Sequence, residues 1–258
     1  MIRKYAEMRP DELAAALIEN PLFICPWGAL EWHGPHLPLG LDGLVAESFC
    51  ARLAEATGGI LLPCTWLPIT TLPHPASLCL PTATVCAVWR DWFDALAGAG
   101  ARTICLVTGH YAQGHECEMY RECRDAMRRH SGLRVLAASP LELMLSDAML
   151  DHAGRHETAQ LLAVRSDLAR LDLFEEGAPA HNAVLGEDPR LATPQQGEQL
   201  LSDGVQSWQS ALELWTVPII QQFYLRREKG YRPYRAEFFK ESWEQAIADW
   251  WRQRSGDR

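Results

Sequence analysis

The residues with the clearest potential for chemistry lie in the twelve-residue stretch 31–42, EWHGPHLPLGLD. This stretch contains Glu31, two histidines and Asp42, and it directly follows the apolar run LFICPWGAL. Buried carboxylates and imidazoles are costly unless a partner compensates them. Mixed imidazole and carboxylate groups suit zinc, manganese or a similar divalent ion, so the stretch is a candidate part of a metal site.

Further candidate ligands follow other predicted elements. Glu31 and His33 are two residues apart at the end of a predicted strand, so their side chains point to the same side while the chain stays extended. His110 directly follows the apolar run TICLVTG, and Glu157 lies at the start of a predicted helix in DHAGRHETAQLL. With Asp42, these residues supply two imidazoles and three carboxylates, and a carboxylate can bridge two ions. The sequence therefore predicts a metal site, with a two-metal site as the sharper hypothesis.

A structural role is the alternative for each of these residues by itself. A histidine after a strand is often a hydrogen-bonded structural residue, and Asp42 stands where a helix N-cap is expected. The occurrence of all five residues at the ends of predicted elements favours the metal site over five separate structural roles.

The elements that position these residues alternate along the chain. Short apolar runs predict strands at 22–27, 60–67, 103–109 and 133–139. Helical patterns lie at 10–20, 42–57, 83–99, 113–131, 156–166, 194–215 and 237–253, and 172–193 is expected to be an irregular connection. The alternation predicts a three-layer α/β/α fold with a mainly parallel central sheet. Ligands of such sheets bind at the carboxyl ends of the strands, where the candidate ligands lie.

Composition restricts the class of partner. The 258 residues, 48% hydrophobic and 22% charged, are typical of a globular protein, which we expect to be a single domain over 1–258. The charge of −9, without a Lys/Arg-rich block, predicts a small-molecule substrate and neither a nucleic acid nor a membrane surface as partner. A signal-peptide core and a run of about 18 apolar residues are both missing, so we expect a cytoplasmic protein. The eight scattered cysteines are interpreted as core residues.

Three motifs, in order, resemble those of the creatininase (creatinine amidohydrolase) family. The first motif of that family is Glu-x-His-Gly-x-His-Leu-Pro followed by an Asp nine residues after the first His, and the stretch from Glu31 to Asp42 has the same residues at these spacings. TGHYAQG resembles its Asn-Gly-His segment, and HAGRHET resembles its third motif, a His followed five residues later by Glu and then Thr. The resemblance covers about the first two thirds of the chain, and three ordered motifs make it specific.

This resemblance implies a creatininase-like fold and a dinuclear-metal-dependent hydrolase. Glu31 and His110 would hold one ion, His33 and Glu157 the other, and Asp42 would bridge them, with zinc or manganese as the expected metals. Water activated by the ions would attack the carbonyl of a small cyclic amide or related amide. The family commonly assembles as hexamers, so a homo-oligomer is expected.

The resemblance also assigns residues around the metals. His152 would be the catalytic histidine that transfers a proton to the leaving group, and orienting Glu157 is its alternative role. Tyr111 is expected to contact the substrate, and His36 to contact the substrate or support the ligands. His74 lies in a loop that resembles the family's loop only loosely; it is expected to face the substrate, and an exposed residue without a role is the alternative.

Departures from the family pattern bear on the substrate. Creatininase proper has a glutamate where this chain has Ala112, so creatinine itself is not the expected substrate. Thr108 replaces the usual asparagine, which removes an amide that could hold the loop. His115, Glu116 and Glu118 are interpreted as the solvated face of the following helix, and contact of at least one of them with the pocket is the alternative.

Two other functions stay open. Some relatives hydrolyse cyclic polyol ketones, so an enzyme that opens a cyclic ketone or lactone derived from a sugar or inositol is the alternative. The loss of the glutamate at Ala112 also allows a catalytically silent, metal-stabilised subunit. The aromatic residues of 237–253 are interpreted as core or subunit contacts rather than ligand contacts: Phe238, Trp243, Trp250 and Trp251.

Overall fold

A parallel sheet forms the centre of the protein. The computed structural model describes residues 2–144 and 150–255. Its strands are β1 (Arg3–Lys4), β2 (Leu22–Gly28), β3 (Ile60–Leu61), β4 (Thr65–Trp66), β5 (Thr103–Thr108) and β6 (Arg134–Ala138). They pair in parallel in the order β1-β3-β2-β5-β6, and β4 also pairs with β2. The predicted parallel sheet is confirmed.

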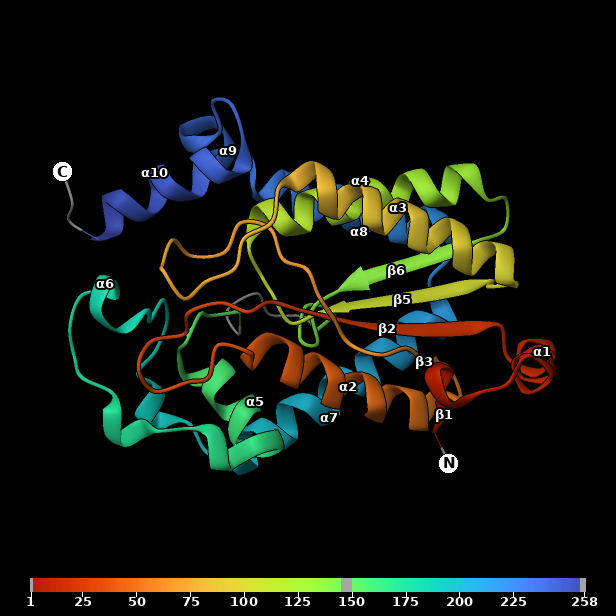
Figure 1. The fold of residues 1–258 in the computed structure, drawn as a ribbon, viewed down its shortest axis with the longest axis horizontal. Coiled ribbons are helices and arrows are strands. Elements are labelled where there is room, and N and C mark those ends of the chain that lie inside the picture. The colour runs from red at the N-terminus through yellow and green to blue at the C-terminus, as the bar shows by residue number, and fades with distance from the viewer. Residues whose placement is uncertain (1, 145–149, 256–258) are drawn as a thin grey trace.

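Helices cover both faces of the sheet (Figure 1). One face carries α2 (Leu41–Thr57), α5 (Arg155–Arg165) and α7 (Pro194–Leu214). The other carries α3 (Thr82–Ala99) and α4 (Gln113–Arg129), with α8 (Val217–Gly230) packed against α4 and β6. Every residue of β2 is buried, because helices cover it on both sides. The predicted three-layer α/β/α fold is confirmed.

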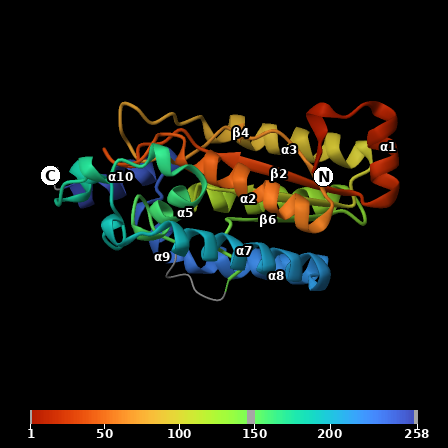
Figure 2. The ribbon, with the colours of Figure 1, turned by 90° about the horizontal axis from the view of Figure 1, so that it is seen from below.

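Shorter elements complete the chain. They are α1 (Pro10–Glu19), α6 (Pro179–Asn182), α9 (Arg232–Phe238), α10 (Trp243–Ser255) and the 3₁₀ turns η1 (Tyr5–Glu7), η3 (Ser166–Leu168), η4 (Leu171–Leu173) and η5 (Pro189–Leu191). In both views α1 lies at the opposite end of the molecule from α5 and α10 (Figure 1, Figure 2). Within the described ranges, no helix combines the length and the apolar character needed to cross a membrane.

Large aromatic side chains fill the core. Trp27, Trp89 and Trp208 are at most 1% exposed, and the ring centroids of Trp27 and Trp89 are 5.5 Å apart. The indole nitrogen of Trp27 donates to the carbonyl oxygen of Leu67 at 3.0 Å, so its polar group is satisfied inside the core. Six of the eight cysteines are buried and all eight are free thiols, which confirms their interpretation as mainly core residues.

Two predicted elements differ from the structure, and one helix was not predicted. The run 60–67 is two short strands rather than one, because Pro63 lies between them and has no N–H for the ladder. The segment 237–253 is not one helix: α9 ends at Phe238, and the hydroxyl of Ser242 caps a new helix by accepting from the backbone N–H of Gln245 at 3.2 Å. Helix α8 was not predicted; Pro218 lies in its first turn, where proline is tolerated.

The crevice at the carboxyl ends of β2 and β5 positions the site. The chain leaves β2 for α2 on one face of the sheet and leaves β5 for α4 on the other (Figure 1). Loops that diverge in this way open a crevice in parallel sheets. Helices α5 and α10 lie at the same end of the molecule as these loops (Figure 2).

Candidate metal centre

The loop between β2 and α2 supplies the first site residues. Glu31, His33 and Asp42 are at most 2% exposed, and Asp42 is the second residue of α2. A Cβ atom at Gly28 would lie 2.3 Å from the Cα atom of Gly43, so a side chain at Gly28 would push α2 away from β2. The close contact of the two glycines therefore brings Asp42 to the end of the central strand.

The turn after β5 supplies His110. A Cβ atom at Gly109 would lie 2.1 Å from the carbonyl oxygen of Asp42, so only glycine lets this turn pass the start of α2. The hydroxyl of Thr108 donates to the carbonyl oxygen of His110 at 3.0 Å and accepts from its backbone N–H at 3.1 Å. The threonine hydroxyl thus holds this loop at the position where the family usually has an asparagine amide.

Glu157 comes from the first turn of α5. The carboxylate of Asp151 accepts from the backbone N–H groups of His156 at 2.8 Å and Glu157 at 3.1 Å, which fixes the start of the helix. Ala153 has a left-handed backbone with φ of 52°, which is uncommon for a residue with a Cβ atom. Its N–H donates to Oε2 of Glu157 at 2.7 Å and orients that carboxylate.

Five predicted ligands converge into two overlapping groups. Glu31, Asp42 and His110 form one group and His33, Asp42 and Glu157 form the other, with the ligand atoms of each group within 4.8 Å of one another. Nδ1 of His110 lies 2.8 Å from Oε2 of Glu31 and 3.4 Å from Oδ2 of Asp42. Nε2 of His33 lies 3.0 Å from Oδ1 of Asp42 and 3.6 Å from Oε2 of Glu157. Asp42 therefore directs one oxygen toward each histidine.

The hydrogen bonds of the two histidines test whether a cation fits. Nδ1 of His33 lies 3.0 Å from the carbonyl oxygen of Glu31, and Nε2 of His110 lies 2.9 Å from that of Ile69. A carbonyl only accepts, so these nitrogens carry the hydrogen in the neutral rings, and the other nitrogens carry lone pairs that face carboxylates. Among the described residues, Oε2 of Glu31, Nε2 of His33 and both oxygens of Asp42 have no hydrogen-bond partner. A metal ion between them would satisfy these atoms, so the residues fit a metal.

The electrostatics of the site favour a positive charge. Burial alone lowers the pKa of His33, but the negative charges of Asp42 and Glu157 outweigh burial and raise that pKa to about 10. Burial likewise opposes a charge on His110, yet Glu31 and Asp42 raise its pKa well above the usual value. A metal ion competes with the proton for the same nitrogens, and the same carboxylates would stabilise it.

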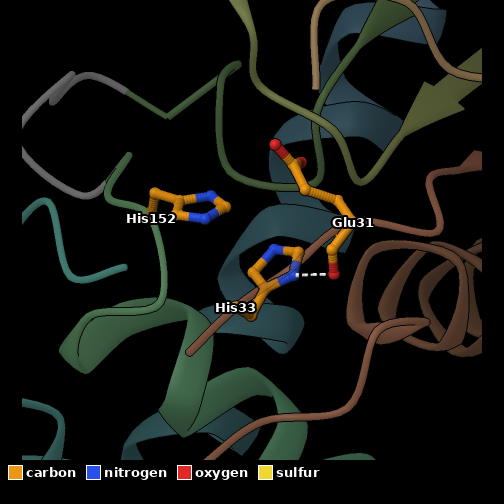
Figure 3. A group of neighbouring side chains, drawn as sticks. All are labelled: Glu31, His33 and His152. Atoms are coloured by element: carbon orange, nitrogen blue, oxygen red, sulfur yellow. Dashed lines mark hydrogen bonds between the residues drawn. The ribbon is translucent and has the colours of Figure 1, made fainter. Parts of the chain in front are cut away.

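His152 lies against His33 (Figure 3). Their rings stack with centroids 4.3 Å apart, and Glu31, His33 and His152 form a third group of close ligand atoms. Burial and the nearby His33 lower the pKa of His152 to about 4, so its ring is neutral at pH 7. Nε2 of His152 lies 3.1 Å from the carbonyl oxygen of Trp32, which places the lone pair of the neutral ring on Nδ1.

A cavity of about 720 Å³ lies against this centre. Its lining includes four of the five candidate ligands and His152. Tyr111 also lines it, with its hydroxyl 3.5 Å from Nε2 of Gln160. The predicted position of Tyr111 beside a substrate therefore agrees with the cavity.

The other two predicted substrate residues lie outside the cavity lining. His36 is fully buried, and its Nε2 lies 3.0 Å from the carbonyl oxygen of Ala153, so it supports the turn before α5. His74 stacks on Trp32 with ring centroids 4.4 Å apart, and its Nδ1 accepts from the backbone N–H of Ala76 at 3.1 Å. This placement favours a supporting role for both histidines over direct contact with a substrate.

The comparison with known proteins gives the family. The model of the family described as creatininase, creatinine amidohydrolase, matches residues 6–212. The chain belongs to the creatininase family. Members of this family are hydrolases that act on amides. The three-motif resemblance found in the sequence is confirmed.

Individual relatives and structures agree with this placement. A creatinine amidohydrolase from Pseudomonas putida is 26% identical over 182 residues, which cover 62% of this chain and 70% of the relative. A mycofactocin precursor peptide peptidase from Mycobacterium ulcerans (strain Agy99) is 26% identical over 235 residues, 76% of this chain and 86% of the relative. A creatininase crystal structure has a TM-score of 0.73 at 23% identity, covering 82% of this chain and 96% of that one, which shows the shared fold.

Solved creatininases also include metal forms. A variant of Zn-Zn type has a TM-score of 0.72 and a structure named creatininase Mn has a TM-score of 0.73, both at 24% identity. They cover 81% and 82% of this chain and 96% and 98% of their own chains.

Part of the cavity wall was missed in the sequence. Helices α8, α9 and α10 lie beyond the family match, yet Arg227, Tyr231 and Trp250 line the cavity. Trp250 is thus a cavity residue, although Phe238, Trp243 and Trp251 are buried as interpreted. No local pattern marks this wall, because its residues meet the cavity only through packing between distant segments.

The interpretation of the polar residues of α4 as a solvated face is wrong, whereas the alternative, contact of at least one of them with the pocket, agrees with Glu116 in the cavity lining. His115 and Glu116 are 0% and 1% exposed, and the side chain of Glu118 accepts from the indole nitrogen of Trp243 at 2.8 Å. Nδ1 of His115 accepts from the backbone N–H of Ile69 at 3.4 Å. These side chains face segments that are remote in sequence. Their polar character alone predicted exposure to solvent, but packing against these segments buries them.

Proposed function

We propose that this chain is a dinuclear metal-dependent hydrolase that cleaves the carbon–nitrogen bond of a small amide, cyclic or related. The observation that carries the proposal is the pair of overlapping ligand groups with Asp42 in both. Membership of an amidohydrolase family and the existence of Zn-Zn and Mn forms of creatininase support it, and make zinc or manganese the expected metal.

The proposed ligand set follows the two groups. Glu31 and His110 would hold one ion, His33 and Glu157 the other, and Asp42 would bridge them. Two divalent ions bound there would lower the pKa of water toward neutrality and polarise the carbonyl under attack.

Backbone contacts hold the carboxylates in place for this task. The N–H of Leu72 donates to Oε1 of Glu31 at 2.5 Å, and the N–H of Ala153 donates to Oε2 of Glu157. Each of these two carboxylates therefore has a fixed orientation toward its histidine.

His152 and Tyr111 would handle the protons. His152 is neutral at pH 7, so it can take up the proton of the attacking water and deliver it to the leaving nitrogen. Burial, followed by the charge of Glu157, raises the pKa of Tyr111 well above its usual value, so its hydroxyl keeps its proton. That hydroxyl can donate a hydrogen bond to the substrate from the cavity wall.

The expected substrate is not creatinine. Ala112 lines the cavity where creatininase proper has a glutamate, so a carboxylate near the reacting groups is missing. A cavity of about 720 Å³ is also within the range of sites for drug-sized ligands. The peptidase among the relatives supports an amide larger than one small ring. Neither curated relative described above is a ketone or lactone hydrolase by name, so the alternative from the sequence is not favoured.

Metal content tests this proposal. Protein purified without chelator should contain close to two divalent ions per chain by elemental analysis, and Asp42→Ala should contain markedly fewer. Asp94→Ala, a change at a surface ion pair with Arg129, is the matched control and should keep the metal of the parent. Amine release from a panel of amides then tests turnover of the metal-loaded parent. Failure of the parent to bind either zinc or manganese would refute the proposal.

A further inference from the structure

A second polar cluster lines the cavity that borders the metal centre. We call Glu116, Glu142, Arg227 and Tyr231 the Glu116 cluster. Glu116 comes from α4 and Glu142 from the segment after β6, whereas Arg227 lies in α8 and Tyr231 directly follows it. The cluster thus joins the part of the chain that the family model matches, residues 6–212, to the segment beyond residue 212. It contains none of the proposed metal ligands.

The carboxylate of Glu142 is fully engaged. Its Oε1 accepts from the hydroxyl of Tyr120 at 2.6 Å and pairs with Nε of Arg227 at 2.5 Å. Its Oε2 accepts from the backbone N–H of Ser139 at 2.9 Å. Arg227 in turn donates to the hydroxyl of Tyr231 at 2.8 Å, so this part of the cluster forms a fixed framework.

The carboxylate of Glu116 is only half engaged. Its Oε2 accepts from the hydroxyl of Tyr231 and lies 3.9 Å from Nη2 of Arg227. Its Oε1 has no hydrogen-bond partner in 2–144 and 150–255, and Glu116 is 1% exposed. A buried polar atom without a partner is costly, and such exceptions in native proteins call for a reason. Glu116 lines the cavity, so a ligand in the cavity can supply the missing partner.

The surroundings of Glu116 favour a positively charged partner. In the described part of the chain the cluster has two carboxylates and one guanidinium group. Burial and then the charge of Glu142 raise the pKa of Glu116 well above its usual value, and a hydrogen bond between the two side chains contributes, so without a ligand a proton shared with Glu142 relieves the surplus negative charge. Arg226 also lines the cavity, but it is exposed, so solvent screens its charge.

The adjoining wall is aromatic. The side chains that line the cavity near the C-terminal helices include Trp215, Phe223, Tyr231, Tyr234 and Trp250. The faces of such rings attract ammonium and guanidinium groups and also cover apolar arms. An aromatic wall beside a buried carboxylate suits an organic cation better than a carboxylate ligand.

We infer that the Glu116 cluster is a substrate subsite for a positively charged nitrogen, an ammonium or amidinium group, carried on an apolar arm of the amide. The N–H of this group donates to Oε1 of Glu116, and the aromatic wall covers the arm. The inference rests on the proposed amide hydrolysis, because the arm belongs to the molecule whose carbonyl reaches the metal centre. It gives the segment beyond the family match a role in choosing the substrate.

The test compares two small probes and three proteins. Benzylammonium and its neutral counterpart benzyl alcohol are titrated calorimetrically into the metal-loaded full chain, into Glu116→Gln and into the control Glu118→Gln. Glu118 lies on the same helix but is absent from the cavity lining. The parent should bind benzylammonium about tenfold more tightly than benzyl alcohol. Glu116→Gln should lose about tenfold in affinity for benzylammonium, whereas Glu118→Gln should bind like the parent.

Two results would overturn the inference. One is equal affinity of the parent for the two probes, which needs no variant and so does not depend on the folding of Glu116→Gln. The other is unchanged benzylammonium affinity in a folded Glu116→Gln protein. Binding of the probe requires no turnover, so a chain that cleaves no amide yet discriminates through Glu116 refutes the proposed function and keeps the subsite. A chain that cleaves amides without this discrimination refutes the subsite alone.

Discussion

The hydroxyl of Thr108 holds the turn that presents His110, and its removal tests how the loop supports the metal centre. Thr108→Val keeps the shape of the side chain and removes only the oxygen, so it opens no cavity. The variant loses the bond that the hydroxyl donates to the carbonyl oxygen of His110 and the bond that it accepts from the backbone N–H. Thr108 and His110 are at most 3% exposed, so water does not replace the lost bonds freely.

The expected loss of stability in Thr108→Val follows from these two hydrogen bonds. A buried N–H left without a partner costs about 1–3 kcal/mol, and an ordinary hydrogen bond contributes about 1 kcal/mol net. The buried methyl group of valine recovers part of this loss. We expect the free energy of unfolding of the metal-free chain to fall by about 2 kcal/mol. Loss of a group that orients a ligand typically weakens metal binding by about tenfold to a hundredfold, so the affinity for zinc should fall by at least about tenfold.

Denaturant unfolding measures the free energy of unfolding, on chelator-treated proteins because bound metal would add its own stabilisation. Competition with a metal indicator measures the affinity for zinc. Thr108→Asn, which restores the family's usual residue, should recover most of the metal affinity. Thr84→Val is the matched control, since Thr84 is exposed and should change neither quantity. Parent-like stability and metal affinity in Thr108→Val would show that the hydroxyl does not hold this turn.

Three further predictions concern the metal centre and the cavity beside it. Gly109→Ala should reduce metal content and lower the free energy of unfolding, because the new Cβ atom would lie 2.1 Å from the carbonyl oxygen of Asp42; a parent-like metal content would contradict this close contact. His152→Gln should retain its metal but lose at least about a hundredfold in kcat for a cleaved amide, as expected for removal of a general acid–base, and a parent-like kcat would exclude the proton-transfer role. Because the pKa of Glu116 is raised, mainly by burial and then by Glu142, its contribution to stability is full below the usual pKa and is lost as pH rises toward the folded-state pKa. The stability of Glu116→Gln relative to the parent, measured by denaturant unfolding, should therefore increase as pH rises above the usual pKa of a glutamate, and a constant difference would show that the carboxyl is ionised throughout.

The strands and the metal ligands were predictable because their signals are local. An apolar run bounded by glycine and proline marks β2 and β5 by itself, and a polar residue directly after such a run must lie at the carboxyl end of the sheet. Glu31, His33 and His110 follow this rule, so their convergence could be expected before the fold was known. The homo-oligomer and the single-domain organisation stay predictions.

The cavity wall was not predictable in the same way. Tyr231 reaches Glu116 across 115 positions in the sequence, and Trp243 reaches Glu118 across 125. The periodicity of α4 identifies its polar face but not the later helices that cover that face. His36 is a similar case, because its position in a motif does not reveal that its ring turns toward the backbone of Ala153.

The distribution of residues along the chain separates the proposed chemistry from the proposed recognition. The candidate ligands and His152 lie between residues 31 and 157, inside the family match, whereas half of the Glu116 cluster and all five named residues of the aromatic wall lie beyond residue 212. The ligands depend on glycines and backbone carbonyls that tolerate little change, such as Gly109 against Asp42. The wall consists of side chains on helices that pack over the cavity, where an exchanged side chain alters shape and charge without moving the ligands. Members of a family built in this way can keep the same metal chemistry and cleave different amide substrates. Ala112, where creatininase proper has a glutamate, lines the same cavity as Glu116, which agrees with such a change of substrate.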